Sequence, residues 1–148
     1  MTAAEEVVRK FEGCELDAYL CPARVPTIGW GHTSGVHLGM TITQELADAW
    51  LAADLARAAK GVLALVTRPL TVEQQAALTS LAYNVGTGAL TRSRLIEMVN
   101  ARRDVDAMVE FARWDKANGK ALPGLTARRL AEAQLYGLGC KGGTQSDS

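Results

Sequence analysis

The sequence has no excess of charge of either sign and no long apolar run. Its 148 residues include 16 Lys and Arg against 16 Asp and Glu, so the composition does not indicate a polyanion such as nucleic acid as a partner. The most apolar helix-length window, residues 46–66, is interrupted by Asp48, Asp54, Arg57 and Lys60, and a bilayer core rejects such charges. We therefore expect neither nucleic-acid binding nor stable insertion into a membrane.

Cysteine is also scarce. The three cysteines, Cys14, Cys21 and Cys140, form no C-x-x-C pair, and no His/Cys spacing suits zinc. The opening stretch MTAAEEVVRK lacks a basic segment followed by an apolar core, so it does not resemble a secretory signal. We expect synthesis in the cytoplasm, free thiols, and no metal or cofactor.

The bulk composition is ordinary for a folded protein, with 48% hydrophobic and 22% charged residues. A chain of this length forms one domain, or a small lobe and a larger lobe that share a connecting helix. It buries enough surface to form a core without disulfides.

One segment, between Phe11 and Thr33, differs from its surroundings. Glycine, proline and aromatic residues gather there, in FEGCELDAYLCPARVPTIGWGHT, whereas most of the remaining chain has a helical pattern. Residues 3–11 place apolar side chains at helical spacing, which predicts a short helix that leads into Glu12. Residues 13–42 alternate turn residues with strand-like runs, which predicts a β-hairpin or a three-stranded sheet.

From Thr43 onward the pattern is helical. Thr43 is a suitable N-cap for a long helix over residues 43–66, within which Gly61 is a possible break. The sequence Thr71-Val72-Glu73-Gln74 is a capping box that starts a second helix, and Asn84 to Gly88 provide its stop. Further helices are predicted over residues 93–101, 105–114 and 126–137, with a polar loop at 116–120.

These elements predict an α+β fold that is mostly helical. A small N-terminal β lobe, about residues 13–42, would be joined by the helix over 43–66 to a helical lobe over 70–137. The polar, Gly- and Ser-rich residues 138–148 are expected to form a mobile tail. All of this fits a single domain.

The spacing of three residues carries a family resemblance. Eight residues separate Glu12 from Cys21, and five separate Cys21 from Thr27. Together with Gly13, Thr27-Ile28-Gly29 and Gly31-His32-Thr33, this spacing resembles that of the phage-type lysozymes, glycoside hydrolase family 24, which carry a Glu-x8-Asp-x5-Thr triad. Cys21 stands where that family has Asp. The similarity extends over about residues 5–136, through Tyr83-Asn84-Val85-Gly86 and through Gly124-Leu125 with Arg128, Arg129 and Glu132.

The resemblance implies an endolysin. Its members hydrolyse the β-1,4 bond between N-acetylmuramic acid and N-acetylglucosamine in the glycan strands of bacterial peptidoglycan, in a cleft between two lobes. It implies a monomer that is made in the host cytoplasm and crosses the inner membrane with the help of a holin to cause lysis. Two rivals remain: a catalytically weakened relative that binds peptidoglycan, and a secreted antibacterial effector on the same fold.

Glycoside hydrolysis assigns roles to the three residues. Glu12 is the natural general acid, provided that a partly desolvated cleft keeps it protonated. Thr27 would hold the attacking water through its hydroxyl. Cys21 could act as a base, as a nucleophile or only as a spacer, and we expect an ionised Glu12 beside it to raise the pKa of its thiol. A regulatory disulfide between Cys14 and Cys21 is a further hypothesis.

Several other residues are candidates for substrate binding, each with a structural alternative. Trp30 could stack on a sugar or pack the small lobe, and His32 could contact substrate or make a structural hydrogen bond. Gly31 most simply meets a backbone demand. Tyr83, Asn84 and Gly88 could line the floor of the cleft. The resemblance further implies that Arg128 or Arg129 pairs with Glu12, and the sequence leaves open which one does.

Overall fold

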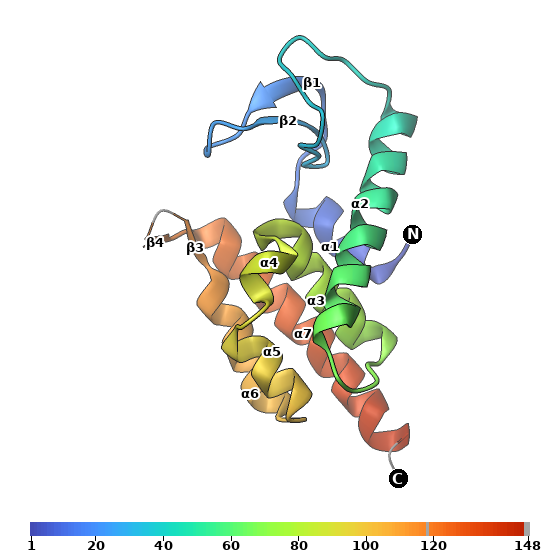
Figure 1. Cartoon of the computed structure of the whole chain (residues 1–148), viewed down its shortest axis with the longest axis vertical. Coiled ribbons are helices and arrows are strands. Elements are labelled where there is room, and N and C mark those ends of the chain that lie inside the picture. Colours follow the sequence, from blue (N-terminus) through green and yellow to red (C-terminus); the bar gives the residue numbers. More distant parts are fainter. Residues whose placement is uncertain (118, 147–148) are drawn as a thin grey trace.

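The computed structural model describes residues 1–117 and 119–146, and for 141–146 the backbone alone. Its elements are, in order, α1 (Ala3–Phe11), β1 (Glu15–Leu20), β2 (Pro26–Gly29), α2 (Gln44–Leu65), α3 (Val72–Val85), α4 (Thr87–Leu90), α5 (Arg94–Asn100), α6 (Asp104–Phe111), the 3-10 helix η1 (Ala112–Trp114), β3 (Lys116–Ala117), β4 (Lys120–Ala121) and α7 (Pro123–Ser146). Figure 1 shows the β1–β2 hairpin at one end, α2 running from it, and the remaining helices gathered in a larger lobe. The predicted α+β class is confirmed.

The small lobe is built on the antiparallel β1–β2 pair. Tyr19 lies opposite Thr27 in this pair, and the register shifts between Glu15 and Tyr19. The segment after β2 touches the hairpin through an isolated bridge between Asp17 and Thr41, so the sheet has two strands rather than three. A small apolar cluster centred on Ile28, Ile42 and Ala47 fills the space beneath the hairpin.

Helix α2 connects the two lobes, as the sequence predicts. Thr43 caps it by accepting a hydrogen bond from the Leu46 amide, and the helix continues through Gly61 without a break. The glycine serves close packing instead, because a Cβ at this position would lie 2.7 Å from Oγ1 of Thr87 in α4. Gly61 therefore allows α4 to approach α2.

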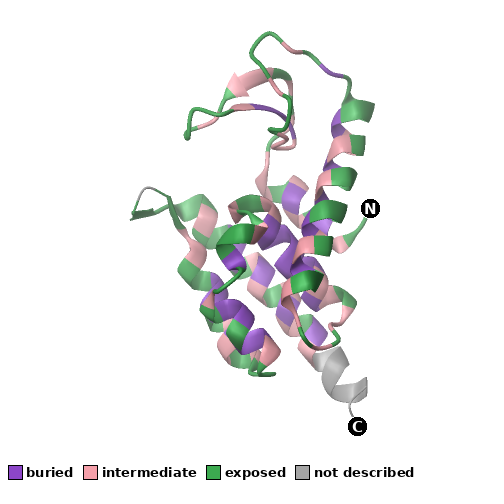
Figure 2. Ribbon diagram, in the orientation of Figure 1, coloured by how far each residue is buried: buried purple, intermediate pink, exposed green. Residues whose placement is uncertain are grey.

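The main core lies in the larger lobe, where α3 packs between α2 and α7. Figure 2 shows the buried positions concentrated there and on the inward stripe of α2. Helix α3 begins with the predicted capping box, in which Thr71 and Gln74 bond each other's backbone amides. It ends at Gly86, whose φ of 90° glycine adopts without strain.

Three features of the larger lobe differ from expectation. The short helix α4 and the β3–β4 hairpin were not predicted, because both are too short to give a periodic signal. Helix α7 begins at Pro123 rather than near residue 126, and proline at a first helical position is favourable. It continues to Ser146, past the expected end at Gly137.

The glycines in α7 explain why it does not end there. A Cβ at Gly137 would lie 2.8 Å from Cε of Met108, and one at Gly139 would lie 2.2 Å from Oγ1 of Thr71. Both glycines therefore permit close packing against α6 and the start of α3. The expected tail at 138–148 is thus helical as far as 146, and residues 147–148 lie outside the described residues.

In the described part of the chain, no helix combines the length and the apolar character that crossing a bilayer requires.

Candidate active site

Glu12 lies where the first helix ends. It is the C-cap of α1, with an extended backbone (φ −95°, ψ 134°), and its amide donates to the Val8 carbonyl over 2.7 Å. The side chain is 26% exposed and accepts a hydrogen bond on Oε1 from Nη1 of Arg128 over 3.0 Å. The end of α1 thus delivers a carboxylate that solvent reaches on one side and a buried arginine holds on the other.

The other carboxylate oxygen faces a position where only glycine fits well. Gly31 has a φ of 106°, and a Cβ there would lie 3.6 Å from Oε2 of Glu12 and 3.2 Å from the Tyr83 hydroxyl. The Tyr83 hydroxyl in turn donates to the Trp30 carbonyl over 2.7 Å. Gly31 therefore lets the backbone after β2 approach both side chains.

Arg128 is the arginine that pairs with Glu12. It is 2% exposed, and besides Glu12 it donates to the Ser80 carbonyl and to Glu132 over 3.2 and 3.3 Å. These contacts fix its guanidinium between α3, α7 and the end of α1. The sequence left open whether Arg128 or Arg129 pairs with Glu12, and in the structure it is Arg128.

Arg129 points elsewhere, although it is the next residue. Its guanidinium donates to Glu132, to the side-chain oxygen of Asn84, and over 2.8 Å to the Trp114 carbonyl. Burial lowers the pKa of Arg129, and the Glu132 charge opposes that effect. Asn84, predicted to line the cleft floor, is itself exposed and accepts from Arg129 at the edge of this network.

Cys21 follows β1 at the start of the hairpin turn. The pKa of the Cys21 thiol lies below its ordinary value. The largest cause is hydrogen bonding from the backbone at Val25, and the Thr27 side chain contributes in the same direction. Glu12 is not among the leading causes. The pKa of Cys21 is lowered rather than raised, contrary to the expectation, because hydrogen bonds to the thiolate outweigh the effects that oppose them.

Thr27 lies on β2 and is 4% exposed. Its hydroxyl donates to the Val25 carbonyl over 2.9 Å. A hydroxyl has one proton, so with that proton on Val25 the Thr27 oxygen is left with lone pairs that accept. The turn after β1 therefore places Cys21, Val25 and Thr27 in one hydrogen-bonded group.

Tyr19 links this group to the catalytic-acid candidate, and sequence reasoning missed it. Burial raises the pKa of Tyr19, and the charges of Glu12 and Cys21 raise it further. In the structure Tyr19 lies opposite Thr27 in the β1–β2 pair, a register that the sequence alone does not specify.

Three predicted substrate-binding residues line one cavity of about 260 Å³ that also contains Asp54 and Arg57: they are Gly31, His32 and Tyr83. Both ring nitrogens of His32 are engaged, Nδ1 with Asp54 over 2.6 Å and Nε2 with the Ser34 carbonyl over 2.9 Å. The ring also stacks near Trp50, with centroids 4.5 Å apart. The His32 ring is therefore held by protein contacts and forms part of the wall of this cavity.

Trp30 has its polar and aromatic contacts inside the protein. Its indole N–H donates to Asp48 over 2.8 Å, and the Arg9 guanidinium lies 5.0 Å from the ring centroid. The ring packs against two apolar clusters, the one centred on Ile28 and a second that includes Val8 and Leu51. These contacts agree with the packing alternative rather than with stacking on a sugar.

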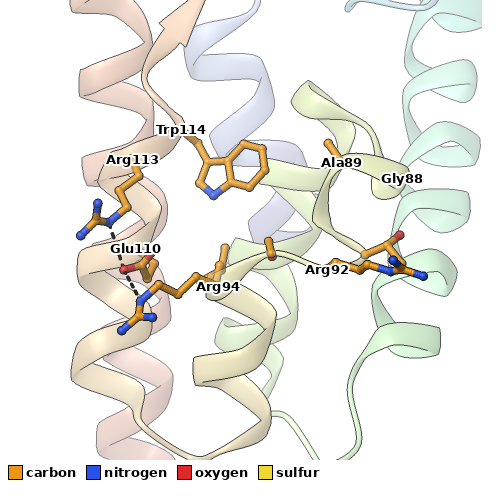
Figure 3. A pocket seen from close by; sticks show the side chains of 10 residues that line it. Gly88, Ala89, Arg92, Arg94, Glu110, Arg113 and Trp114 are labelled. Atoms are coloured by element: carbon orange, nitrogen blue, oxygen red, sulfur yellow. Dashed lines mark hydrogen bonds and ion pairs between the residues drawn. The ribbon is translucent and has the colours of Figure 1, made fainter.

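Gly88 lies apart from the other candidates. It lines a different cavity of about 710 Å³, whose walls carry Arg92, Arg94 and Trp114. Figure 3 shows Arg94 and Arg113 both directed at Glu110 on the opposite side of that cavity from Gly88. Among the described residues, no group of three His, Cys, Asp or Glu could hold a metal ion.

Comparison with known proteins agrees with this arrangement. The family model described as phage lysozyme matches residues 9–132. The chain belongs to the phage lysozyme family. The predicted resemblance is thereby confirmed.

Individual relatives support the same family. An endolysin of Acyrthosiphon pisum secondary endosymbiont phage 1 is 40% identical over 88% of this chain and 92% of its own length. An endolysin of Bacillus phage PZA is 38% identical over 93% of this chain, but the match spans only 54% of that protein. Among solved structures, the muramidase domain of SpmX from Asticaccaulis excentricus has a TM-score of 0.84 and 34% identity, over 92% of this chain and 95% of that one.

Proposed function

We propose that the chain is an endolysin with lysozyme activity that hydrolyses the β-1,4 bond between N-acetylmuramic acid and N-acetylglucosamine of peptidoglycan. Membership of the phage lysozyme family supports the activity. The observation that carries the residue assignment is the placement of Glu12 at the lobe junction, with one oxygen held by Arg128 and the other facing Gly31.

Glu12 acts as the general acid. Because Oε1 accepts from Arg128, the proton to be transferred resides on Oε2, the oxygen that faces Gly31. Oε2 donates this proton to the glycosidic oxygen as the bond to the anomeric carbon breaks, and positive charge develops on the sugar ring. The carboxylate left behind is stabilised by the Arg128 cation.

Cys21 and Thr27 act on the second reactant. The Cys21 thiolate, favoured by hydrogen bonds from the backbone at Val25, accepts a proton from a water molecule while that water's oxygen attacks the anomeric carbon. The Thr27 oxygen accepts the other hydrogen of the water, since its own proton is on Val25. Direct attack by the thiolate on the sugar is the alternative route.

A substitution series separates these roles from a spacer role. Lysis of outer-membrane-permeabilised cells is followed by turbidity for Cys21→Asp, Cys21→Ser and Cys21→Ala. Loss of about a hundredfold in Ser and Ala, with activity kept in Asp, indicates proton transfer. Full activity in all three variants contradicts any chemical role for Cys21.

Glu12→Gln tests the enzyme against its binding-only rival. The variant is expected to leave turbidity unchanged, whereas Glu6→Gln on the exposed face of α1 is expected to lyse like the unaltered protein. The rival, a weakened peptidoglycan-binding relative, predicts that the unaltered protein binds sacculi without releasing reducing sugar.

Access to the wall is part of the proposal. The chain would act as a monomer, be made in the host cytoplasm and reach peptidoglycan when a holin opens the inner membrane. Expression in cells without a holin should then leave them intact, and co-expression of a holin should lyse them. Lysis without a holin contradicts this route and favours an effector that is exported on its own.

A further inference from the structure

Behind the Glu12 carboxylate lies a buried charge cluster, which consists of Arg128, Arg129, Glu132 and Ser80. The exposed fractions of Arg128, Arg129 and Glu132 are 2%, 1% and 0%. No solvent reaches Glu132, so its charge is compensated only by protein groups. Three charged side chains fully buried on one turn of α7 need an explanation beyond stability, because a hydrophobic replacement often stabilises as well as an ion pair does.

Glu132 bonds every other member of the cluster. Its Oε2 accepts from the Ser80 hydroxyl over 2.6 Å and from Nε of Arg128 over 3.3 Å, and its Oε1 accepts from Arg129. Arg128 then reaches forward to Glu12 over 3.0 Å. Glu132 therefore determines where the guanidinium that contacts the catalytic acid can lie.

Glu132 also alters the charge that Glu12 experiences. A cation beside a carboxyl group favours the ionised form, which cannot donate a proton to a leaving oxygen. Two buried arginines without a counter-ion would oppose the catalytic state. With Glu132 ionised and Glu12 protonated, Arg128, Arg129 and Glu132 sum to a single positive charge instead of two.

The other titratable groups around these two carboxyls do not supply that compensation. Tyr83 of α3 and Tyr19 of β1 face Glu12, and both are neutral near neutral pH, because burial raises their pKa values. Asp115, after η1, raises the pKa of Arg129 less than Glu132 does. Glu132 is thus the anion in direct contact with both arginines.

We propose that Glu132 is a positioning residue for the catalytic acid: it holds Arg128 against Glu12 and offsets the charge of the two arginines, so that Glu12 stays protonated at the pH of catalysis. This inference rests on the proposed role of Glu12 as general acid. It concerns a side chain that never touches the substrate.

The readout is the pH dependence of the rate of reducing-sugar release at low substrate concentration. Glu132→Gln keeps the shape of the side chain and removes its charge, which leaves an extra buried cation near Glu12. The limb on which activity falls with rising pH should move to lower pH by about one unit. A purely structural role would lower the rate by the same factor at every pH.

Arg129→Gln supplies the same test with the opposite sign. It removes one cation that does not touch Glu12, so the alkaline limb should move to higher pH. The double variant Glu132→Gln/Arg129→Gln restores the charge of the cluster, and its alkaline limb should return toward that of the unaltered protein although its packing is doubly altered. Circular dichroism and thermal melting verify that each variant is folded, and if Glu132→Gln is not, Arg129→Gln alone decides.

Asp104→Asn is the matched control. Asp104 also accepts from a partly buried arginine and a hydroxyl, Arg68 over 2.9 Å and Tyr136 over 2.8 Å, but in a part of the lobe that does not contact Glu12. It should lower the melting temperature without moving either limb. If the unaltered protein is active but the alkaline limb of the pH–rate profile does not move in Glu132→Gln or in Arg129→Gln, the inference is overturned while the proposed function stands. Release of no reducing sugar by the unaltered protein overturns the proposed function with it.

Discussion

The guanidinium of Arg128 donates to Glu12 over 3.0 Å, across a separation of 116 residues in sequence. This contact ties the end of the first helix to the last helix, and it brings the candidate acid to the junction of the lobes. The short helix α1 could not hold Glu12 there by itself, because isolated helices of this length are not stable in water.

Replacement of Arg128 by Gln should destabilise the fold by about 3 kcal/mol, because the substitution leaves Glu132 with one cation fewer in a buried setting. Urea unfolding followed by circular dichroism measures the change. Arg113→Gln is the comparison, since Arg113 also pairs with a glutamate but is 69% exposed, and it should cost less than about 1 kcal/mol. Equal losses in the two variants would show that burial of the Arg128 pair carries no weight.

The thiol of Cys21 should react with iodoacetamide at lower pH than an ordinary cysteine. Its pKa lies below the ordinary value, so the reactive thiolate is populated at lower pH. The rate of alkylation against pH, followed by mass spectrometry, gives the midpoint directly. Thr27→Val removes a hydroxyl that favours the thiolate when its one proton turns from the Val25 carbonyl to Cys21, and should move the midpoint to higher pH; a midpoint that does not move would contradict this role of Thr27.

The pair His32 and Asp54 should stabilise the junction of β lobe and α2. The two side chains are 14% and 10% exposed and share a 2.6 Å hydrogen bond, so Asp54→Asn should cost about 2 to 3 kcal/mol, as expected for a buried hydrogen bond to a charged group. A double-mutant cycle with His32→Asn measures the coupling. Arg57 also contacts Asp54 but is 71% exposed, and Arg57→Ala should change stability by less than about 1 kcal/mol.

Gly31→Ala and Gly35→Ala separate backbone strain from loss of space at the site. Both glycines have positive φ, 106° and 70°, but a Cβ at Gly35 meets nothing within 4 Å. Each substitution should destabilise the protein by about 1 kcal/mol through strain. Only Gly31→Ala should also reduce lysis, by at least about tenfold, because its Cβ would lie 3.2 Å from the Tyr83 hydroxyl and crowd that side chain beside Glu12. Similar activity in the two variants would contradict the close approach at Gly31.

Local sequence signals predicted the elements that carry strong periodicity or capping. The N-cap at Thr43 and the capping box at Thr71 and Gln74 are present as expected. Apart from the elements that are too short to give a periodic signal, the wrong expectations arose at glycines whose role depends on tertiary packing. Gly61, Gly137 and Gly139 looked like helix breakers, but each is small because another element packs against it, and no single sequence reveals such a neighbour.

The candidate site was predictable as a set of residues, although not as a set of contacts. The spacing of Glu12, Cys21 and Thr27 indicated the family together with the further motifs over about residues 5–136. The arginine that pairs with Glu12 could not be predicted, because Arg128 and Arg129 are adjacent and chemically identical. Only the rotation of α7 decides which one faces the acid. The lowered pKa of Cys21 depends on the turn geometry at Val25, which its residue types do not specify.

The central claim is that Glu12 protonates the glycosidic oxygen of the bond after N-acetylmuramic acid. Purified sacculi are digested with the unaltered protein, with Glu12→Gln and with Glu6→Gln, and the soluble products are reduced with borohydride and weighed by mass spectrometry. The account predicts muropeptides with reduced N-acetylmuramic acid ends from the unaltered protein and from Glu6→Gln, and none from Glu12→Gln. Products that end in reduced N-acetylglucosamine, or undiminished release by Glu12→Gln, would contradict it.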